Sequence, residues 1–265
     1  MLLEAHDISL DVPDMNHRSV FGARRKLRIL NGVSLSIGKG ETMGIVGESG
    51  SGKTSLGRTL LRLCEPSEGR LLFGGADITH EEPDRLKPLR RRMQMIFQDP
   101  QSSLNPRHTV SRILGAALRL HGLAADTKSL TGILDRVGLP ATALGRYPHQ
   151  LSGGQRQRVG IARAIALKPD FVVADEIVSG LDVSTQAQVL DLLKTLRAEM
   201  GMALAFISHD LSVVRHLCER VVIMRGGEII EEGSTAQVFA APRTEFTQNL
   251  ISSIPLPVVP NGKKD

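Results

Sequence analysis

The chain has 265 residues, 41% of them hydrophobic, which suits one large α/β domain or two small ones and argues against disorder of the whole chain. Its formal net charge of +5 is compatible with binding to nucleic acid, anionic lipid or a phosphate-rich ligand. Because the basic residues are scattered, it is equally compatible with an ordinary solvated surface. Two distant cysteines, Cys64 and Cys218, argue against a disulfide framework and fit a reducing compartment.

The beginning of the chain, Met1–Asp7, has no basic segment followed by an apolar one and does not resemble a secretory signal. Nowhere does an uninterrupted apolar run approach the ~20 residues that a membrane-spanning helix needs. We therefore expect the chain to reach any membrane that it serves through a partner.

The first predicted elements surround a glycine-rich loop. Val33–Ile37 alternates apolar and polar residues, as a half-buried strand does, and Thr42–Val46 follows as a more buried strand. After the loop, leucines at helical spacing predict a helix over Lys53–Leu63. The order strand, glycine loop, helix frames the first motif.

The motif G-x-x-x-x-G-K-[ST] is matched by Gly47-Glu48-Ser49-Gly50-Ser51-Gly52-Lys53-Thr54. Its glycines allow backbone N–H groups to converge on phosphate oxygens, and the following helix directs its positive end at them. Lys53 is suited to the β- and γ-phosphates and the Thr54 hydroxyl to Mg²⁺. A glycine-rich linker would not explain the flanking strand and helix, so we predict a phosphate-binding site.

Helical spacing of the apolar residues between Pro100 and Lys168 predicts a helical insert. Within it, a helical run is preceded by Leu151-Ser152-Gly153-Gly154-Gln155. Ser152 and the two glycines can form a second anion-binding cradle at the helix start, whereas a simple capped helix needs the serine but not the glycines and the glutamine. Two phosphate cradles so far apart in sequence suggest a site shared between subunits.

Two fully apolar segments, Phe171–Ala174 and Leu204–Ile207, are predicted strands separated by a helix over Thr185–Glu199. Strands that alternate with helices imply a parallel sheet with crossover helices. Asp175 and Glu176 end the first of these strands, where Asp175 can hold Mg²⁺ through water and Glu176 can polarise an attacking water. The alternative interpretation of Asp175 and Glu176, a strand that ends in a polar helix cap, is much less favoured in a chain that has a phosphate loop upstream.

These segments resemble the nucleotide-binding subunit of ABC transporters, and the resemblance covers nearly the whole chain. Gly47–Thr54 resembles the Walker A loop, and Gln98, which follows Phe97, matches the family's Q-loop. Leu151–Gln155 matches the signature motif, which is the most family-specific segment of the set.

The later motifs follow in the order that the family has. Asp175 and Glu176 match Walker B and its catalytic glutamate, Ser179–Asp182 resembles the D-loop, and His209 resembles the switch histidine. A histidine or a glutamine alone would be a weak signal, but the order of the motifs leaves almost no room for coincidence.

The resemblance implies an α/β fold, with a P-loop ATPase core built on a parallel sheet, an N-terminal antiparallel β region and an inserted helical subdomain at about residues 100–166. The ABC nucleotide-binding domain would then occupy residues 1–254, and a flexible proline-rich tail residues 255–265. The family also implies a head-to-tail dimer in which Walker A of one subunit faces the signature motif of the other.

ATP and Mg²⁺ are the ligands that the resemblance implies. Catalytic roles would fall to Glu176, His209 and Gln98, and metal contacts to Thr54, Gln98 and Asp175. The residues expected to contact the nucleotide are Gly47, Glu48, Ser49, Gly50, Ser51, Gly52, Lys53, Thr54, Ser152, Gly153, Gly154, Gln155 and Asp182.

Four further segments narrow the resemblance to the dipeptide, oligopeptide and nickel importers, namely Gly47–Gly50, Phe97–Pro100, Ser103–Arg107 and Tyr147–Gln150. The chain lacks the C-terminal cysteine cluster of many larger members and is similar to the short ones. The implied partners are transmembrane permease subunits, a second ATPase subunit (a paralogue or another copy) and, indirectly, a periplasmic or extracellular solute-binding protein. No nucleic-acid partner is expected, and the implied location is the cytoplasmic face of the plasma membrane, as a peripheral subunit.

Two positions depart from the importer pattern. Ile177 follows Glu176 where these importers commonly have proline, and we expect a modest local effect. Val12 occupies the position of the aromatic residue that usually stacks on adenine. Phe21 or an arginine from Pro13–Arg28 is the alternative contact to the base.

Other classes of function explain less of the sequence. Chromosome-maintenance and DNA-repair ABC ATPases insert a long coiled coil or a zinc module before the signature motif, and this interval contains no heptads and no cysteine pairs. Ribosome-associated members usually carry two such domains in one chain. A small-molecule kinase with a phosphate loop would leave Leu151–Gln155 unexplained. Neighbouring genes for permeases and a binding protein would distinguish a transporter subunit from these alternatives.

Overall fold

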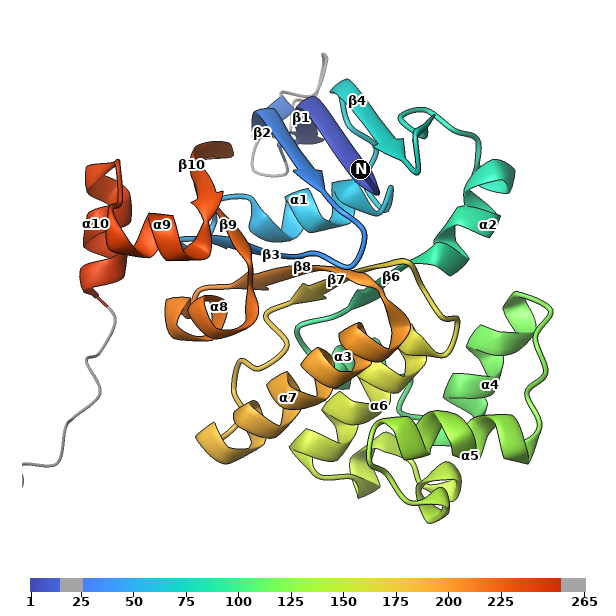
Figure 1. Ribbon diagram of the computed structural model, residues 1–265. Helices are drawn as coiled ribbons and strands as arrows, with labels where there is room; N and C mark the ends of the chain where they lie inside the picture. The colour runs from blue at the N-terminus through green and yellow to red at the C-terminus, as the bar shows by residue number, and fades with distance from the viewer. Residues whose placement is uncertain (15–25, 254–265) are drawn as a thin grey trace, which may run out of the picture.

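The computed structural model describes residues 1–14 and 26–253, so the predicted tail at 255–265 lies outside the described residues. Its strands form two sheets (Figure 1). The smaller sheet is antiparallel, with the order β2-β1-β4-β5, and consists of β1 (Leu3–Pro13), β2 (Lys26–Ile37), β4 (Glu68–Phe73) and β5 (Ala76–Asp77). The larger sheet has the order β10-β9-β3-β8-β7-β6 and consists of β3 (Thr42–Gly47), β6 (Met93–Ile96), β7 (Phe171–Asp175), β8 (Ala203–Ser208), β9 (Arg220–Arg225) and β10 (Glu228–Ser234).

In the larger sheet β3, β6, β7, β8 and β9 run parallel, while β10 pairs antiparallel with β9 at one edge. The strands β3, β7 and β8 are buried along their whole length, as continuous apolar runs predict for parallel strands covered on both faces. The predicted strands at Phe171–Ala174 and Leu204–Ile207 are confirmed within β7 and β8, and Val33–Ile37 is the end of the longer β2.

Most helices begin at a capping residue that the sequence supplies. At the starts of α4, α5, α6 and α7, a side-chain oxygen accepts a hydrogen bond from the backbone N–H three residues on, and the four capping residues are Thr109, Asp126, Ser152 and Asp182. The helices are α1 (Lys53–Leu60), α2 (Pro83–Arg92), α3 (Pro100–Ser103), α4 (Val110–Leu120), α5 (Thr127–Arg136), α6 (Gly153–Ile165), α7 (Val183–Met200), α8 (Leu211–Leu217), α9 (Thr235–Ala240) and α10 (Glu245–Ser252). Short 3₁₀ turns cover Ala141–Gly145 and Pro148–Gln150.

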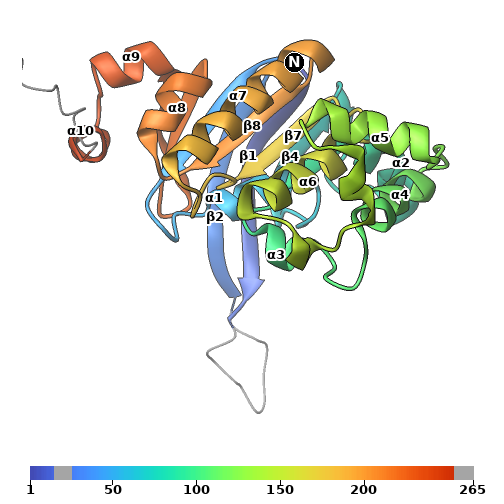
Figure 2. The same ribbon diagram turned by 90° about the horizontal axis from the view of Figure 1, so that it is seen from below.

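The two faces of the larger sheet carry separate hydrophobic layers. On one face, α1 and the smaller sheet pack over side chains that include Ile45 and Val173 (Figure 1). On the other, α6 and α7 pack over side chains that include Val172 and Phe206 (Figure 2). Because successive side chains of a strand point to opposite faces, β7 contributes Val172 to one layer and Val173 to the other.

A helical insert lies between β6 and β7, where the sequence predicts one, and consists of α3, α4, α5, the two 3₁₀ turns and α6. It packs on the same face of the sheet as α7 (Figure 2). Among the described residues, no helix has the length and apolarity that crossing a membrane requires.

Gly57 allows α1 to lie directly on the parallel sheet. A Cβ at this position would come within 2.9 Å of Val173 Cγ1 and 2.8 Å of Ile207 Cδ1. Alanine normally stabilises a helix relative to glycine by about 1 kcal/mol. Here the crowding of the β-branched Val173 should outweigh that gain, because overpacking a core costs typically ~1–3 kcal/mol.

We therefore expect Gly57→Ala to lower the free energy of unfolding in urea titrations. Gly132→Ala in α5 is the matched control, since a Cβ there meets no described atom within 4 Å apart from its chain neighbours and the backbone of its own helix, and it should raise the same free energy. Equal stabilisation by both substitutions would show that α1 is not held tightly against the sheet.

Candidate functional site

The carboxyl ends of the parallel strands bring the predicted site residues together. Gly47–Thr54 follows β3, Asp175 and Glu176 lie at the end of β7, and His209 follows β8. The strands β3, β8 and β7 are neighbours, and β6, which precedes Gln98, is next to β7. The loops of an open parallel sheet form ligand sites at this edge.

The loop Gly47–Thr54, called the phosphate loop from here on, is held close to β9 and β2. A Cβ on Gly47 would lie 2.2 Å from the Met224 carbonyl oxygen, so only glycine fits there. Gly52 has a φ of 98° and begins α1, a backbone conformation that favours glycine. These contacts fix the shape of the loop, and its last backbone N–H groups lie at the N-terminus of α1.

Gly227, in the turn between β9 and β10, supports the phosphate loop and is not predicted from the sequence. Its N–H donates to the Ser51 carbonyl at 3.1 Å, and its own carbonyl accepts from the Asn31 N–H at 3.0 Å. A Cβ on Gly227 would lie 2.4 Å from the Ile29 carbonyl oxygen. The Gly226-Gly227 pair marks a turn in the sequence, but its contact with a loop far away in the chain is visible only in the fold.

The side chain of Lys53 packs against the phosphate loop. Its ammonium donates to the carbonyl oxygens of Gly47 at 2.8 Å and Glu48 at 2.7 Å, and the side chain is buried. Burial lowers the pKa of Lys53, and the negative charges of Glu176 and Asp175 oppose that shift. The ammonium thus lies beside the loop, and the carboxylates of Asp175 and Glu176 at the end of β7 act on its charge.

Buried oxygens next to Lys53 form a set that suits a phosphate and a hard cation. The Ser51 hydroxyl is buried and has no hydrogen-bond partner among the described residues. The Thr54 hydroxyl donates to Asp175 Oδ1 at 3.1 Å. Burial raises the pKa of Asp175, and the charge of Glu176 raises it further, against the hydrogen bond from Thr54. A buried carboxylate of this kind is stabilised by a cation.

Glu176 is held between two of the other predicted catalytic residues. Gln98 Nε2 donates to Glu176 Oε2 at 2.9 Å, and His209 Nδ1 lies 3.4 Å from Glu176 Oε1, an ion pair when the imidazole is protonated. The backbone of Glu176 has a φ of 46°, in the left-handed region, while its N–H donates to the Ile207 carbonyl at 2.9 Å. Strain of this kind persists where surrounding contacts fix the backbone, and it is common at functional sites. The next residue, Ile177, is buried in the hydrophobic layer between the larger sheet and the helices α6 and α7.

The second predicted cradle, Ser152–Gln155, is built differently from the first. Ser152 caps α6: its hydroxyl accepts from the Gln155 N–H at 3.2 Å, and the Gln155 side chain accepts from the Ser152 N–H at 3.1 Å. A Cβ on Gly154 would lie 2.7 Å from Thr185 Cγ2, so this glycine lets α6 approach α7. Both carboxylate oxygens of Asp182 bind Thr185, which lowers the pKa of Asp182.

The predicted residues therefore fall into two groups. The phosphate loop, Gln98, Asp175, Glu176 and His209 lie at one edge of the sheet. Ser152–Gln155 start α6, on the face of the sheet opposite to α1, and no hydrogen bond or ion pair among the described residues joins them to the phosphate loop (Figure 1). Gly153 instead borders a separate cavity of about 350 Å³, which Gln98 and Ser179–Leu181 also line.

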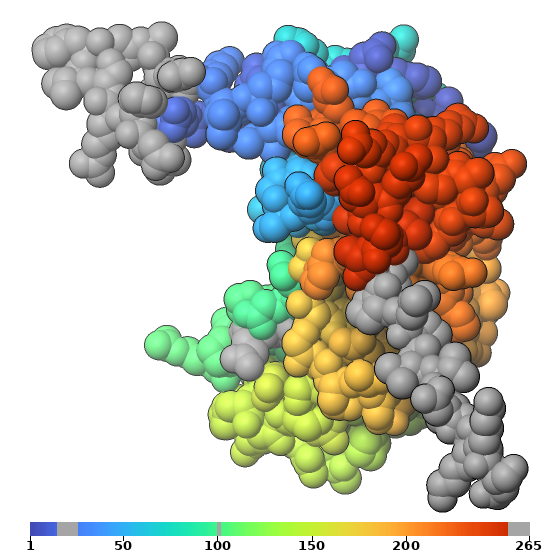
Figure 3. Space-filling view, turned by 90° about the vertical axis from the view of Figure 1, so that its left-hand side faces the viewer, coloured from blue at the N-terminus to red at the C-terminus, as the bar shows by residue number. Residues whose placement is uncertain are grey.

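The phosphate loop lies on an open face of the molecule. In Figure 3 the light-blue surface of this loop and α1 lies in a recess, with the blue N-terminal strands above it and the green and yellow helices below.

Known proteins resemble this chain in sequence and in fold. The family model described as ABC transporter matches residues 30–179. The chain is 49% identical over 234 residues to a putative peptide import ATP-binding protein of Brucella ovis, which covers 87% of this chain and 74% of that protein. It is 47% identical to the oligopeptide transport ATP-binding protein AppF of Bacillus subtilis, with 87% of this chain and 71% of that protein covered.

Among solved structures, the chain resembles the ATP-binding cassette MJ0796, described as a dimer in a post-hydrolysis state bound to ADP and phosphate. The TM-score is 0.76 at 28% identity, over 88% of this chain and 98% of that one. The family match over residues 30–179 includes the phosphate loop, Gln98, Ser152–Gln155, Asp175 and Glu176, and ends before His209.

Proposed function

The chain belongs to the ATP-binding subunits of the ABC transporter family, and on this premise we propose that it hydrolyses ATP in a site completed by a second ATPase subunit and so drives the import of peptides. The observation that carries this proposal is the position of Glu176 at the end of β7, bonded to Gln98, beside His209 and next to the Thr54–Asp175 pair. Two similar proteins are named for peptide import and for oligopeptide transport, and these names support peptides as the cargo.

Binding of the ATP phosphates falls to the phosphate loop. Its N–H groups and the positive end of α1 stabilise the negative charge of the phosphates. Lys53 adds a charged donor, and the unpaired Ser51 hydroxyl adds a neutral one. These contacts neutralise the phosphate chain and orient its terminal phosphorus toward the end of β7.

Thr54, Asp175 and Gln98 are the residues that would hold Mg²⁺, which supplies neutralisation of the phosphate charge when bound. Their hydroxyl, carboxylate and amide oxygens are the ligand types that this ion prefers. Mg²⁺ is usually held by one or two carboxylates together with the phosphates of a substrate, and Asp175 is the one carboxylate of this set. We therefore expect Mg²⁺ to bind together with ATP.

Glu176 is placed to accept a proton from the attacking water. Gln98 and His209 hold its two carboxylate oxygens in a fixed orientation, and the hydrogen bond from its N–H to the Ile207 carbonyl fixes the position of its backbone. The water attacks the terminal phosphorus, the bond to the bridging oxygen breaks, and ADP and phosphate result. General base catalysis of this kind contributes about 10²–10⁴ in rate.

The remaining contacts come from the second ATPase subunit, a paralogue or another copy of this chain. In a head-to-tail pair, the Ser152 hydroxyl, the N–H groups of Gly153 and Gly154, and Gln155 approach the terminal phosphate from the partner, at the N-terminus of its α6. Asp182, which is also expected to contact the nucleotide, caps the start of α7 by accepting two hydrogen bonds from Thr185. ATP thereby joins the two subunits, and hydrolysis releases them.

Closing and opening of this pair would move the transmembrane permease subunits, which meet the chain at the cytoplasmic face of the membrane. Gln98 lies in the loop between β6 and α3, so its hydrogen bond connects the Glu176 carboxylate to a segment that a permease can contact. A periplasmic or extracellular solute-binding protein would deliver the cargo to the permease, without contact to this chain.

The cargo can be tested on the complete transporter, purified with its permeases and its binding protein and reconstituted in vesicles. An oligopeptide mixture should stimulate ATP hydrolysis and accumulate in the vesicles, whereas nickel salts should do neither. Stimulation by nickel alone would assign the chain to a metal importer and leave its ATPase role intact.

Recognition of the base should be weak, because Val12 offers no aromatic face. Val12 lies on β1 opposite Leu27 of β2 and is partly buried, while Phe21 is outside the described residues. Base–aromatic stacking is worth about 1–3 kcal/mol, or roughly a factor of 5–150 in affinity. We expect similar affinities for ATP and GTP, and tighter ATP binding in Val12→Tyr.

A fluorescence titration with both nucleotides measures this, with Val12→Leu as the control that adds apolar volume without a ring. Strong preference of the unmodified chain for ATP, lost in Phe21→Ala, would assign base recognition to Phe21 instead.

A further inference from the structure

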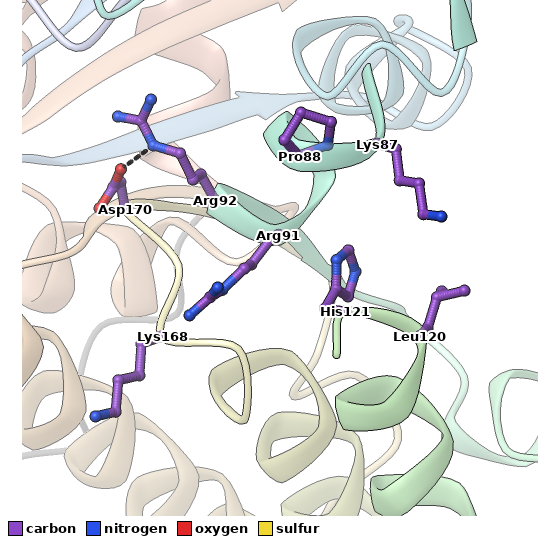
Figure 4. Close-up of a pocket in the computed structure, with 8 residues that line it drawn as sticks. All are labelled: Lys87, Pro88, Arg91, Arg92, Leu120, His121, Lys168 and Asp170. Atoms are coloured by element: carbon purple, nitrogen blue, oxygen red, sulfur yellow. Dashed lines mark hydrogen bonds and ion pairs between the residues drawn. The ribbon is translucent and has the colours of Figure 1, made fainter. Parts of the chain in front are cut away.

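A cavity of about 670 Å³ lies far from the phosphate loop, between α2, the end of α4 and the loop that precedes β7 (Figure 4). It is next to the residues that enter β6 and β7, so it lies at the amino ends of the parallel strands, whereas the phosphate loop lies at their carboxyl ends. Its charged and titratable lining consists of Lys87, Arg91, Arg92, His121, Lys168 and Asp170.

The single carboxylate in this lining is already paired. Arg92 Nε donates to Asp170 Oδ2 at 2.6 Å, and the same guanidinium lies over the Phe73 ring at 4.8 Å. Arg92 and Asp170 therefore tie the end of α2 to the loop before β7. Their pairing gives the wall of the cavity a fixed shape and leaves no free negative charge in it.

Three other cations line the same cavity without a partner. Within the described parts of the chain, the side chains of Lys87, Arg91 and Lys168 form no ion pair and no hydrogen bond. In Figure 4, Arg91 extends from α2 toward the loop that carries Lys168 and Asp170. The attraction between cations and a helix C-terminus accounts for a basic residue in the last turn of α2, but not for Lys87 one turn earlier.

The positive charges of Lys87 and Arg91 repel one another. Lys87 and Arg91 are four residues apart on α2, a spacing at which like charges destabilise a helix. Burial and the charges of Arg91 and Lys87 lower the pKa of His121, which favours the neutral imidazole. An anion in the cavity would remove this repulsion.

We propose that the cavity between α2, α4 and the loop before β7 binds a phosphorylated anion, held by Lys87, Arg91 and Lys168. Its volume is within the range of about 300–1,000 Å³ of small-molecule sites. Flexible ammonium groups and a guanidinium are the side chains that bind phosphate oxygens. The phosphate can belong to a free oligophosphate or to a lipid head group, and Leu120, which is 66% exposed beside the cavity, offers an apolar contact to a lipid.

Calorimetry with inorganic tripolyphosphate tests the free anion, on the full chain with its phosphate loop saturated by ADP and Mg²⁺. Lys87→Glu/Arg91→Glu should weaken binding at least about tenfold, because two attractions become repulsions. Arg90→Glu is the matched control, since it reverses an exposed charge on the same helix outside the cavity and should leave the affinity within about twofold. Sedimentation with vesicles of phosphatidylglycerol and phosphatidylcholine, compared with phosphatidylcholine alone, tests the lipid head group with the same variants.

Unchanged ADP affinity in each variant shows that the chain is folded, and Lys87→Gln/Arg91→Gln replaces the reversal if it is not. Tripolyphosphate binding that depends on the two residues supports a free ligand, and vesicle binding alone supports a head group. Binding of neither probe, or equal weakening by Arg90→Glu, would overturn the proposal. ATP hydrolysis enters none of these measurements, so their outcome is independent of the role proposed for Glu176.

Discussion

Glu176→Gln should lower ATP turnover by roughly 10²–10⁴ and leave ATP binding unchanged, because the amide keeps the shape of the side chain but cannot accept a proton from water. The glutamine can still accept from Gln98 and keep the backbone contact with Ile207, so the site should remain assembled. Steady-state hydrolysis and nucleotide titration of the same preparation measure both properties.

The same substitution should also accumulate an ATP-bound pair of subunits, because hydrolysis no longer separates them. Size exclusion with ATP and Mg²⁺ would show it as an ATP-dependent shift in mass. Glu199→Gln in α7, outside the site, is the control and should hydrolyse ATP normally. Near-normal turnover in Glu176→Gln would remove this residue from the role of general base.

Ser152→Arg should lower hydrolysis by at least about 10², the effect of losing a donor to the transition state, while the same chain binds ATP as before. In the proposed pair, Ser152–Gln155 act on the nucleotide of the other subunit, and the chain's own phosphate loop is untouched. The substitution also removes the cap of α6, which costs about 1 kcal/mol of stability.

Ser234→Arg separates these two effects. Ser234 caps α9 in the same way, accepting from the Gln237 N–H at 3.3 Å, but lies outside both cradles. It should lose a similar stability and keep its hydrolysis. If Ser152→Arg weakened ATP binding to the isolated monomer, the signature segment would act on its own chain's nucleotide.

Local patterns predicted much of the fold and the contents of the site. The phosphate loop is one continuous segment whose glycines, Lys53 and Thr54 can be recognised without the rest of the fold, and the short apolar runs in β7 and β8 favour buried strands. Since parallel strands place their carboxyl ends at one edge, the sequence order alone brings Asp175, Glu176 and His209 near the loop.

Contacts between distant segments could not be predicted in this way. Gln98 and Glu176 are 78 residues apart, and their hydrogen bond depends on β6 lying next to β7. The left-handed backbone of Glu176 and the support that Gly227 gives to Ser51 depend on neighbouring strands. The cations of the proposed anion cavity come from two distant segments, α2 and the loop before β7, and show no motif in the sequence.

The dependence of hydrolysis on a second subunit is most directly tested by measuring the ATPase rate per chain over a hundredfold range of protein concentration, with light scattering to report the mass. While the chain is monomeric, its rate should stay at the background of Glu176→Gln, and activity should appear only as it pairs with another copy or with added partner ATPase. A monomer that hydrolyses ATP at a rate independent of concentration, abolished by Glu176→Gln, would contradict a site shared between two subunits.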